Sequence, residues 1–161
     1  SYIAAEEDSF GDLYQWGRGT DGHQIRTSNT TSTQFSNPTT TNNKFVIGGT
    51  DWLNSPNNTL WQGVNGTNNP CPSGFRVPTE TELSNLNLAD ASDAFTTLKL
   101  PVAGFRNAVD GTLINVGSFG YYWSSTDVGG TNAGRLFVLT NTSFVGSTDR
   151  ANGFSVRCLK D

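Results

Sequence analysis

The chain has 161 residues, a formal net charge of −4 and only 15% charged residues, while Gly, Asn, Thr and Ser dominate and Met is absent. No stretch is apolar enough to cross a membrane, and no basic stripe could displace counterions from phosphates, so membrane insertion and nucleic-acid binding are not expected. The composition favours a soluble domain of short strands joined by many turns, exported or exposed at a surface.

The N-terminal segment is expected to carry no chemistry. Because there is no initiator Met, we expect the N-terminus to be processed or cut from something longer. The acidic run at residues 6–8 is interpreted as a solvated leader, since no spaced metal ligands follow it. Residues 10–18 predict a short buried strand or turn with Trp16 in the core. The lone His23 is interpreted as a loop residue rather than a ligand or a base, because no second His is present.

Polar, irregular sequence fills the next part of the chain. Residues 27–43 are nearly all Thr, Ser and Asn, which predicts a long loop that is either ordered by the body beneath it or functional. Residues 45–47 predict a brief apolar strand. In residues 51–66, Trp52 and Trp61 are interpreted as anchors in the core; the alternative is an exposed pair that stacks on a sugar.

The strongest local signal is a helix start within residues 69–83. Pro78 holds the entering chain extended, Thr79 is a good N-cap, and Glu82 three residues later completes a capping box. The apolar stripe of this amphipathic helix is expected to comprise Leu83, Leu86 and Leu88.

The two cysteines, Cys71 and Cys158, are the only possible partners for each other. The polar, export-like composition favours a disulfide that ties the helix start to the last strand. Two buried free thiols are the alternative.

The second half predicts a run of short antiparallel strands. Pro101 places the strand expected at residues 98–106 at a sheet edge or a bulge, and Asp110-Gly111 is a hairpin turn. A Gly-rich loop is expected at residues 127–134. The expected strands are residues 98–106, 112–116, 121–126, 135–139, 143–145 (a hairpin around 140–142) and 154–158.

Six blocks of the sequence carry a family resemblance. They are residues 11–18, 51–66, 69–82, 98–106, 121–126 and 153–161. In order and spacing they resemble the Fibrobacter succinogenes major paralogous domain family, which implies an exported or surface protein. The implied fold is α+β: a single C-type lectin-like domain over residues 1–161, with short twisted antiparallel strands, one or two helices and long loops.

Part of the same pattern resembles the formylglycine-generating enzyme branch of that fold. This enzyme uses a reactive pair of cysteines late in the chain, and here only Cys158 lies late. No Ser-His-Asp set forms around the single His23, and no phosphate-binding loop occurs. Asp127 and Asp149 are interpreted as ordinary turn residues. We therefore expect no enzyme, no cofactor and no metal site.

A recognition module is the favoured function. Some proteins of the implied fold are variable proteins of diversity-generating retroelements, whose mutable positions lie in the C-terminal strands, and the matching region is residues 119–152. We expect a secreted, cell-surface or virion-surface module that binds a cell-surface glycan or protein. The alternative is a structural domain of a surface fibre or phage tail. The candidate ligand-binding residues are Asp127, Asn132, Arg135, Phe137, Asn141, Thr142, Asp149 and Arg150.

Strand 135–139 is apolar on both faces. It is therefore either buried on both sides or presents Phe137 and Leu139 outward as a patch. If Phe137 is core, the candidate residues around it are ordinary loop surface.

Overall fold

The structure is a computed structural model that describes residues 9–161, so the expected acidic leader at residues 6–8 lies outside the described residues. Most strands within this range are only two residues long. The elements are β1 (Tyr14–Gln15), β2 (Thr30–Thr31), β3 (Phe45–Val46), β4 (Phe75–Arg76), α1 (Glu80–Ser84), α2 (Ala91–Leu98), β5 (Phe105–Arg106), β6 (Leu113–Ile114), β7 (Gly120–Asp127), β8 (Asn132–Val138), β9 (Ser143–Asp149), β10 (Gly153–Phe154) and β11 (Leu159–Lys160).

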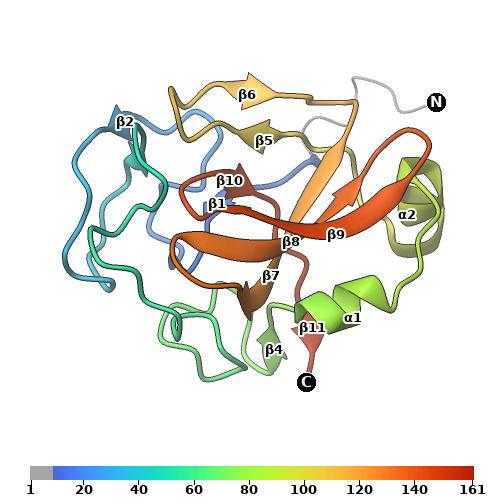
Figure 1. Cartoon of the computed structure of the whole chain (residues 1–161), viewed down its shortest axis with the longest axis horizontal. Helices are drawn as coiled ribbons and strands as arrows, with labels where there is room; N and C mark the ends of the chain where they lie inside the picture. Colours follow the sequence, from blue (N-terminus) through green and yellow to red (C-terminus); the bar gives the residue numbers. More distant parts are fainter. Residues whose placement is uncertain (1–8) are drawn as a thin grey trace.

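The three longest strands, β7, β8 and β9, form an antiparallel sheet with β8 at its centre (Figure 1). A second sheet has the order β1-β10-β5-β6, and two smaller sheets pair β11 with β4 and β2 with β3. In the second sheet Tyr14 lies opposite Phe154, so strands from the two ends of the described chain are direct neighbours. This mixture of sheets with two short helices is consistent with the expected α+β class.

The predicted capping box at the start of α1 is confirmed. Thr79 Oγ1 accepts the backbone N–H of Glu82 at 3.2 Å, and Glu82 Oε2 accepts the backbone N–H of Thr79 at 2.8 Å. The helix is only five residues long, so the predicted apolar stripe is incomplete. Leu83 is buried and Leu88 packs partly against the same cluster, but Leu86 lies past the helix end and is 39% exposed.

Helix α2 was not expected at its position, and the strand prediction for residues 98–106 is wrong except at β5. Asp90 caps the helix by accepting the backbone N–H of Asp93 at 2.9 Å, and Ala94 is buried beneath it. Lys99 ends the helix in the left-handed conformation, with φ of 56°. The helix overlaps the expected strand only at Leu98, and its left-handed end at Lys99 turns the chain before β5 begins at Phe105.

Other strand predictions hold with shifted ends. Strand β7 covers the expected residues 121–126, and β8 and β9 close a hairpin around residues 140–142. The turn at residues 110–111 joins β5 to β6, with Gly111 at φ of 77°. The Gly-rich loop is shorter than expected because β8 already begins at Asn132. The continuous closing strand expected at residues 154–158 is wrong: β10 ends at Phe154, and β11 begins only at Leu159.

The predicted disulfide between Cys71 and Cys158 is present, with the two Cα atoms 5.7 Å apart. Cys158 directly precedes β11, which pairs with β4 so that Leu159 lies opposite Arg76. Because β4 leads into the capped start of α1, the bridge ties the end of the chain to that helix. The alternative of two free thiols is not found.

The four tryptophans are all buried, which confirms the anchor interpretation of Trp52 and Trp61. Trp52 Nε1–H donates to the carbonyl of Trp16 at 2.7 Å, and Trp61 Nε1–H donates to the carbonyl of Arg18 at 3.2 Å. Their rings are fully enclosed. The alternative that this pair stacks on a sugar is therefore wrong.

The long loop at residues 27–43 is ordered by the body beneath it. It contains only the two-residue strand β2. The ring of Phe35 packs against Trp52 at 6.4 Å, and the Phe35 backbone N–H donates to the Trp52 carbonyl at 3.0 Å. Asn68 Nδ2–H donates to the carbonyl of Pro38 at 2.7 Å. This outcome matches the first of the two alternatives for the loop.

The two faces of the β7-β8-β9 sheet have different coverings. Helices α1 and α2 pack on one face, where Leu83 and Ala94 meet Tyr122, Leu136 and Val138 of the sheet. On the other face an aromatic cluster that includes Tyr121, Trp123 and Phe154 covers β7. Neither helix of the described residues has the length and apolar character that a membrane span requires.

Candidate functional site

The exposed part of the aromatic face lies on β8 and β9. Side chains alternate along a strand, so Arg135 and Phe137 point away from the helices while Leu136 and Val138 point toward them. The register places Phe144 opposite Phe137 and Gly146 opposite Arg135 on the same face. We call Arg135, Phe137 and Phe144 the Arg135 patch.

A row of aromatic rings runs from this patch into the core. Phe144 is 46% exposed and contacts half-buried Phe137 edge to face, with ring centroids 5.1 Å apart. Phe137 contacts Tyr121 in the same way at 4.6 Å, and Tyr121 contacts buried Phe154 at 5.3 Å. The two edge-to-face contacts orient the rings of Phe144, Phe137 and Tyr121 relative to one another. The exposed ring of Phe144 is therefore held on a rigid support.

Arg135 carries a positive charge at this surface without a counterion. Its guanidinium lies over the ring of Phe137, with 3.2 Å between Cζ and the ring centroid. Nε and Nη1 are buried and have no hydrogen-bond partner, and no carboxylate of the described residues forms an ion pair with Arg135. Burial lowers the pKa of Arg135 to about 10, so the group remains charged at neutral pH.

Gly146 lies beside the guanidinium of Arg135 and adds no side chain next to Nη1. A Cβ at this position would lie 3.7 Å from Nη1 of Arg135 and about 3.9 Å from the ring of Phe144, which are ordinary contact distances. A methyl group therefore fits without strain. A longer side chain would extend across the patch.

The hairpin tip places Asn141 and Thr142 at one end of the sheet. Both are exposed. The tip lies beside the start of α2, because the backbone N–H of Ala91 donates to the carbonyl of Leu139 at 2.8 Å. Phe137 and Phe144 come next along the two strands, so the tip adjoins the Arg135 patch at its aromatic end.

Asp127, Asn132 and Asp149 lie at the opposite end of the sheet. Asn132 and Asp149 are paired in register and belong to the face that carries Leu136. Asp127 receives a hydrogen bond from Arg150 and another from the backbone of Gly129 at 2.8 Å. These three side chains do not join the Arg135 patch.

Arg150 is a structural residue and not an exposed contact residue. It is 1% exposed, and its guanidinium lies over the ring of Trp16 at 4.4 Å. It donates to the Asn132 carbonyl at 3.2 Å and forms ion pairs with Asp127 and, at 4.0 Å, with Asp51. Burial raises the pKa of Asp51 to about 6. A side chain enclosed in this way cannot reach a ligand, so the prediction that Arg150 binds one is wrong.

The eight predicted residues therefore do not form one surface. Arg135 and Phe137 lie together, Asn141 and Thr142 adjoin them, and the remaining residues lie elsewhere. The most exposed member of the patch, Phe144, was missed. The sequence could have indicated it. Phe144 is the second residue after the hairpin turn, and strand alternation places it on the opposite face from Ser143 and Val145.

The lone histidine is part of the buried hydrogen-bond network of the fold. His23 is fully buried; its Nε2 accepts the backbone N–H of Gln15 at 3.1 Å and its Nδ1 is hydrogen-bonded to Asp21 at 2.6 Å. Burial lowers the pKa of His23 to about 4, and the bond to His23 holds the pKa of Asp21 down at about 2. Within residues 9–161 no group of three or more His, Cys, Asp or Glu side chains could hold a metal ion.

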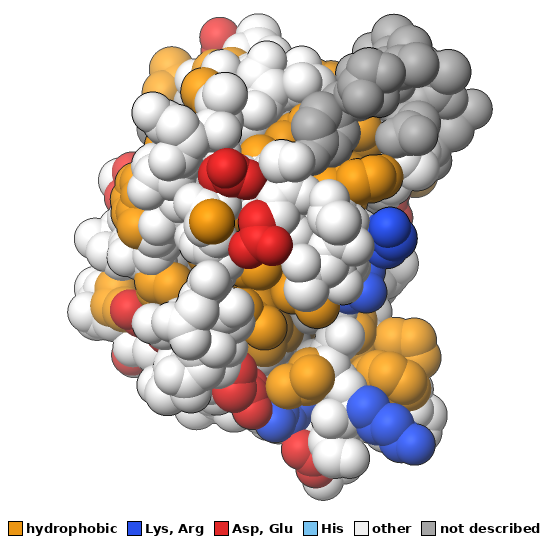
Figure 2. Space-filling view, turned by 90° about the vertical axis from the view of Figure 1, so that its right-hand side faces the viewer, with side chains coloured by type: hydrophobic (Ala, Val, Ile, Leu, Met, Phe, Trp, Pro, Cys, Tyr) orange, Lys and Arg blue, Asp and Glu red, His pale blue; other side chains and the backbone are white. Residues whose placement is uncertain are grey.

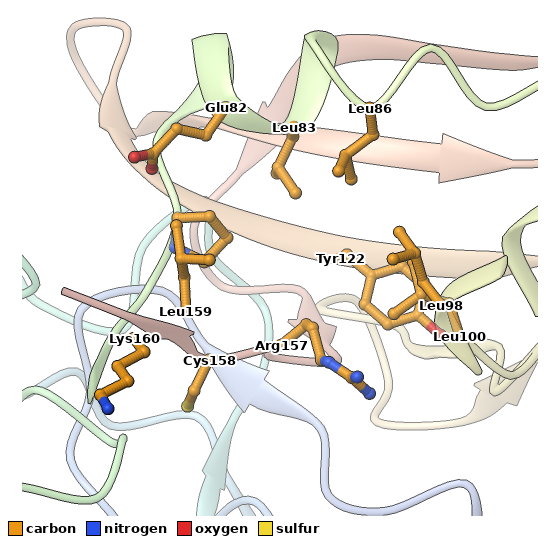
Figure 3. A pocket seen from close by; sticks show the side chains of 11 residues that line it. Glu82, Leu83, Leu86, Leu98, Leu100, Tyr122, Arg157, Cys158, Leu159 and Lys160 are labelled. Carbon is orange, nitrogen blue, oxygen red and sulfur yellow. The ribbon is translucent and has the colours of Figure 1, made fainter. Parts of the chain in front are cut away.

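A second exposed apolar surface lies on the helix side of the sheet. It is a groove of about 250 Å³ between α1, the end of α2 and β11, with Leu86 and Leu159 partly exposed at its edge and Arg157 and Lys160 beside them (Figure 3). Figure 2 shows hydrophobic side chains exposed next to Lys or Arg side chains on the lower half of the face that it presents. The sequence interpretation did not single out this groove.

Compared with protein-family models, curated proteins and solved structures, the chain shows no match.

Proposed function

We propose that this protein is a secreted or surface-exposed recognition module with a C-type lectin-like fold, which binds a cell-surface glycan or protein through the Arg135 patch. The fold assignment is supported by the capped helix packed on short antiparallel strands, by the long loops, and by the direct pairing of β1 with β10. An exported location is supported by the disulfide between Cys71 and Cys158, because such bonds persist in oxidising compartments.

One observation carries the functional proposal: a half-buried, unpaired guanidinium stacks on Phe137 beside the exposed ring of Phe144. Leaving a charged donor desolvated and unpaired costs free energy, and a protein that keeps such a group at its surface gains when a ligand supplies the acceptor. Arginine and aromatic residues are also the side chains most enriched where binding energy concentrates.

The patch is also pre-organised for binding. β8 pairs with a strand on each side, and the aromatic row links Phe144 to the buried core. Little side-chain freedom remains to be lost when a ligand binds, which favours affinity.

The experiment is an array of glycans and host-surface proteins, probed with the wild-type protein and with the variants Arg135→Gln and Phe144→Thr. The matched control is Val128→Thr, which replaces a 44%-exposed apolar residue in the β7–β8 loop, at the end of β8 away from Phe144. We expect both patch variants to lose binding that the control retains, at unchanged thermal stability. Equal binding by all variants would contradict the proposal.

A structural domain of a surface fibre or phage tail is the second candidate. The apolar groove with Leu86 and Leu159 favours it, because exposed apolar surface is typical of an assembly contact. Sedimentation of the purified protein tests this candidate. If it is correct, the protein should self-associate, and Leu159→Ser should weaken that association.

Formylglycine-generating activity has less support. Both cysteines of the chain are joined in one disulfide, so neither provides the free thiolate that this chemistry uses.

A further inference from the structure

Arg135 differs from the other buried or half-buried arginines in having no oxygen partner. Three of the others form ion pairs with carboxylates and two donate to backbone carbonyls, whereas Arg135 forms neither kind of contact within residues 9–161. The arginines paired with carboxylates are Arg18, Arg76 and Arg150, and those bonded to carbonyls are Arg26 and Arg106.

The free edge of the guanidinium determines what can bind. Nε and Nη1 are the buried nitrogens without partners, and Nη2 is not among them. A guanidinium binds a carboxylate through two parallel hydrogen bonds, either from Nε and Nη2 or from Nη1 and Nη2. Nη2 takes part in both arrangements. A carboxylate oxygen that binds Nη2 therefore lies at the corner shared by both arrangements, next to the unpartnered Nε and Nη1. Gly146 lies beside Nη1 and adds no side chain there.

The surroundings favour a protein over a small saccharide. Phe144 borders a hollow on the helix side of the sheet together with Leu88 and Leu136, but neither Arg135 nor Phe137 lines it. Small ligands generally bind in concave pockets with several convergent polar groups, which this patch lacks. An exposed Phe beside an Arg is instead the composition typical of the centre of a protein interface.

We infer that the Arg135 patch binds a protein segment that presents an Asp or Glu carboxylate next to an apolar side chain. The carboxylate pairs with the guanidinium of Arg135, and the apolar side chain packs on Phe144. This inference rests on the proposed function and names the ligand chemistry of the same site.

The test begins with a random peptide display library, selected on the wild-type protein and counter-selected on Gly146→Leu. The leucine adds apolar bulk beside Arg135 and Phe144 without replacing either residue, since its Cβ meets both at ordinary contact distances. We expect the enriched peptides to share an Asp or Glu adjacent to an apolar residue. No enrichment over the counter-selection would overturn the inference.

One enriched peptide is then synthesised with its acid intact and with the acid changed to the corresponding amide. Titration calorimetry should show that the amide form binds the wild-type protein about tenfold or more weakly. For Arg135→Gln the two peptides should bind equally. The matched control Arg157→Gln, which removes an exposed cation at the groove of Figure 3, should preserve the full difference.

The remaining outcomes separate the two proposals. Enriched peptides without an acid, or an acid-to-amide effect below about twofold, would overturn the carboxylate inference and leave the patch as a recognition site. Peptides that bind Gly146→Leu as well as wild type would overturn the patch itself. Binding of oligogalacturonate that depends on Arg135, with no enriched peptide, would overturn the protein partner in favour of an acidic glycan.

Discussion

The guanidinium of Arg135 lies over the ring of Phe137, two residues further along the same strand, with 3.2 Å between Cζ and the ring centroid. Residues two apart on a strand share a face, so the contact follows directly from the pleat. It places a full charge against an apolar surface where no carboxylate of the described residues neutralises it.

The disulfide is the first feature to test. Peptide mass spectrometry of unreduced protein should recover the segments around Cys71 and Cys158 joined. Because the bridge spans 87 positions, loop-closure entropy predicts that Cys71→Ser together with Cys158→Ser lowers the free energy of unfolding by about 4–5 kcal/mol. Two free thiols in freshly exported protein would show that the bridge does not form.

Loss of the N-cap of α1 should lower the free energy of unfolding by less than loss of the disulfide. Thr79→Ala should lower the free energy of unfolding by about 1 kcal/mol, because the backbone N–H of Glu82 loses its acceptor. Thr79→Ser retains the hydroxyl and serves as the control. Urea unfolding with an unchanged midpoint for Thr79→Ala would mean that this cap contributes nothing.

Buried Arg150 should matter for stability rather than for binding. Arg150→Met removes the partner of Asp127 and leaves Asp51 buried without a cation, so we expect a loss of about 3–5 kcal/mol in the free energy of unfolding. An equally stable variant with weakened ligand binding would restore Arg150 to the recognition surface. Thermal unfolding and the array together decide between these outcomes.

His23 predicts a pH dependence of stability. Its pKa is about 4 in the folded protein and 6.5 as the reference for the unfolded chain. The unfolded state therefore binds a proton first as the pH falls, and the contribution of neutral His23 is fully present above pH 6.5 and lost by about pH 4. The shift corresponds to about 3 kcal/mol. His23→Gln should remove this dependence from urea unfolding measured between those pH values.

Asp51 provides the control of opposite sign. Its pKa is raised to about 6, so the folded state holds the proton longer than the unfolded state and stability falls as the pH rises from about 4 to 6. Asp51→Asn should therefore steepen the rise of stability with pH that His23 causes. Parallel curves for the wild-type protein and both variants would contradict these two assignments.

Local signals in the sequence predicted local structure well. Thr79 and Glu82 lie three residues apart, and their reciprocal hydrogen bonds depend only on that spacing. The hairpin around residues 140–142 was also predicted, because its alternation and its turn are contiguous in the sequence. Helix α2 was missed because its buried face consists mainly of alanines, which give a weak periodic signal.

The candidate site was harder to predict, because contacts with residues far away in the sequence decide which side chains are exposed there. Arg150 has the same side chain as Arg135, but it is enclosed by Trp16 and Asp51, which lie about a hundred or more residues earlier in the chain. No pattern near residue 150 indicates that enclosure. The alternation that places Phe137 and Phe144 on one face was local, but which face is exposed depended on where α1 and α2 pack.

The central claim is that recognition occurs at the Arg135 patch. The most direct test measures the dissociation constant of the strongest array partner for wild type, Gly146→Ala and Gly146→Leu. The Ala methyl group meets Arg135 and Phe144 at ordinary contact distances, whereas Leu adds an isopropyl group beyond that position. We predict that Gly146→Ala binds within about twofold of wild type and that Gly146→Leu binds at least about tenfold more weakly, which corresponds to about 1.4 kcal/mol. Wild-type affinity in a stably folded Gly146→Leu would contradict the account.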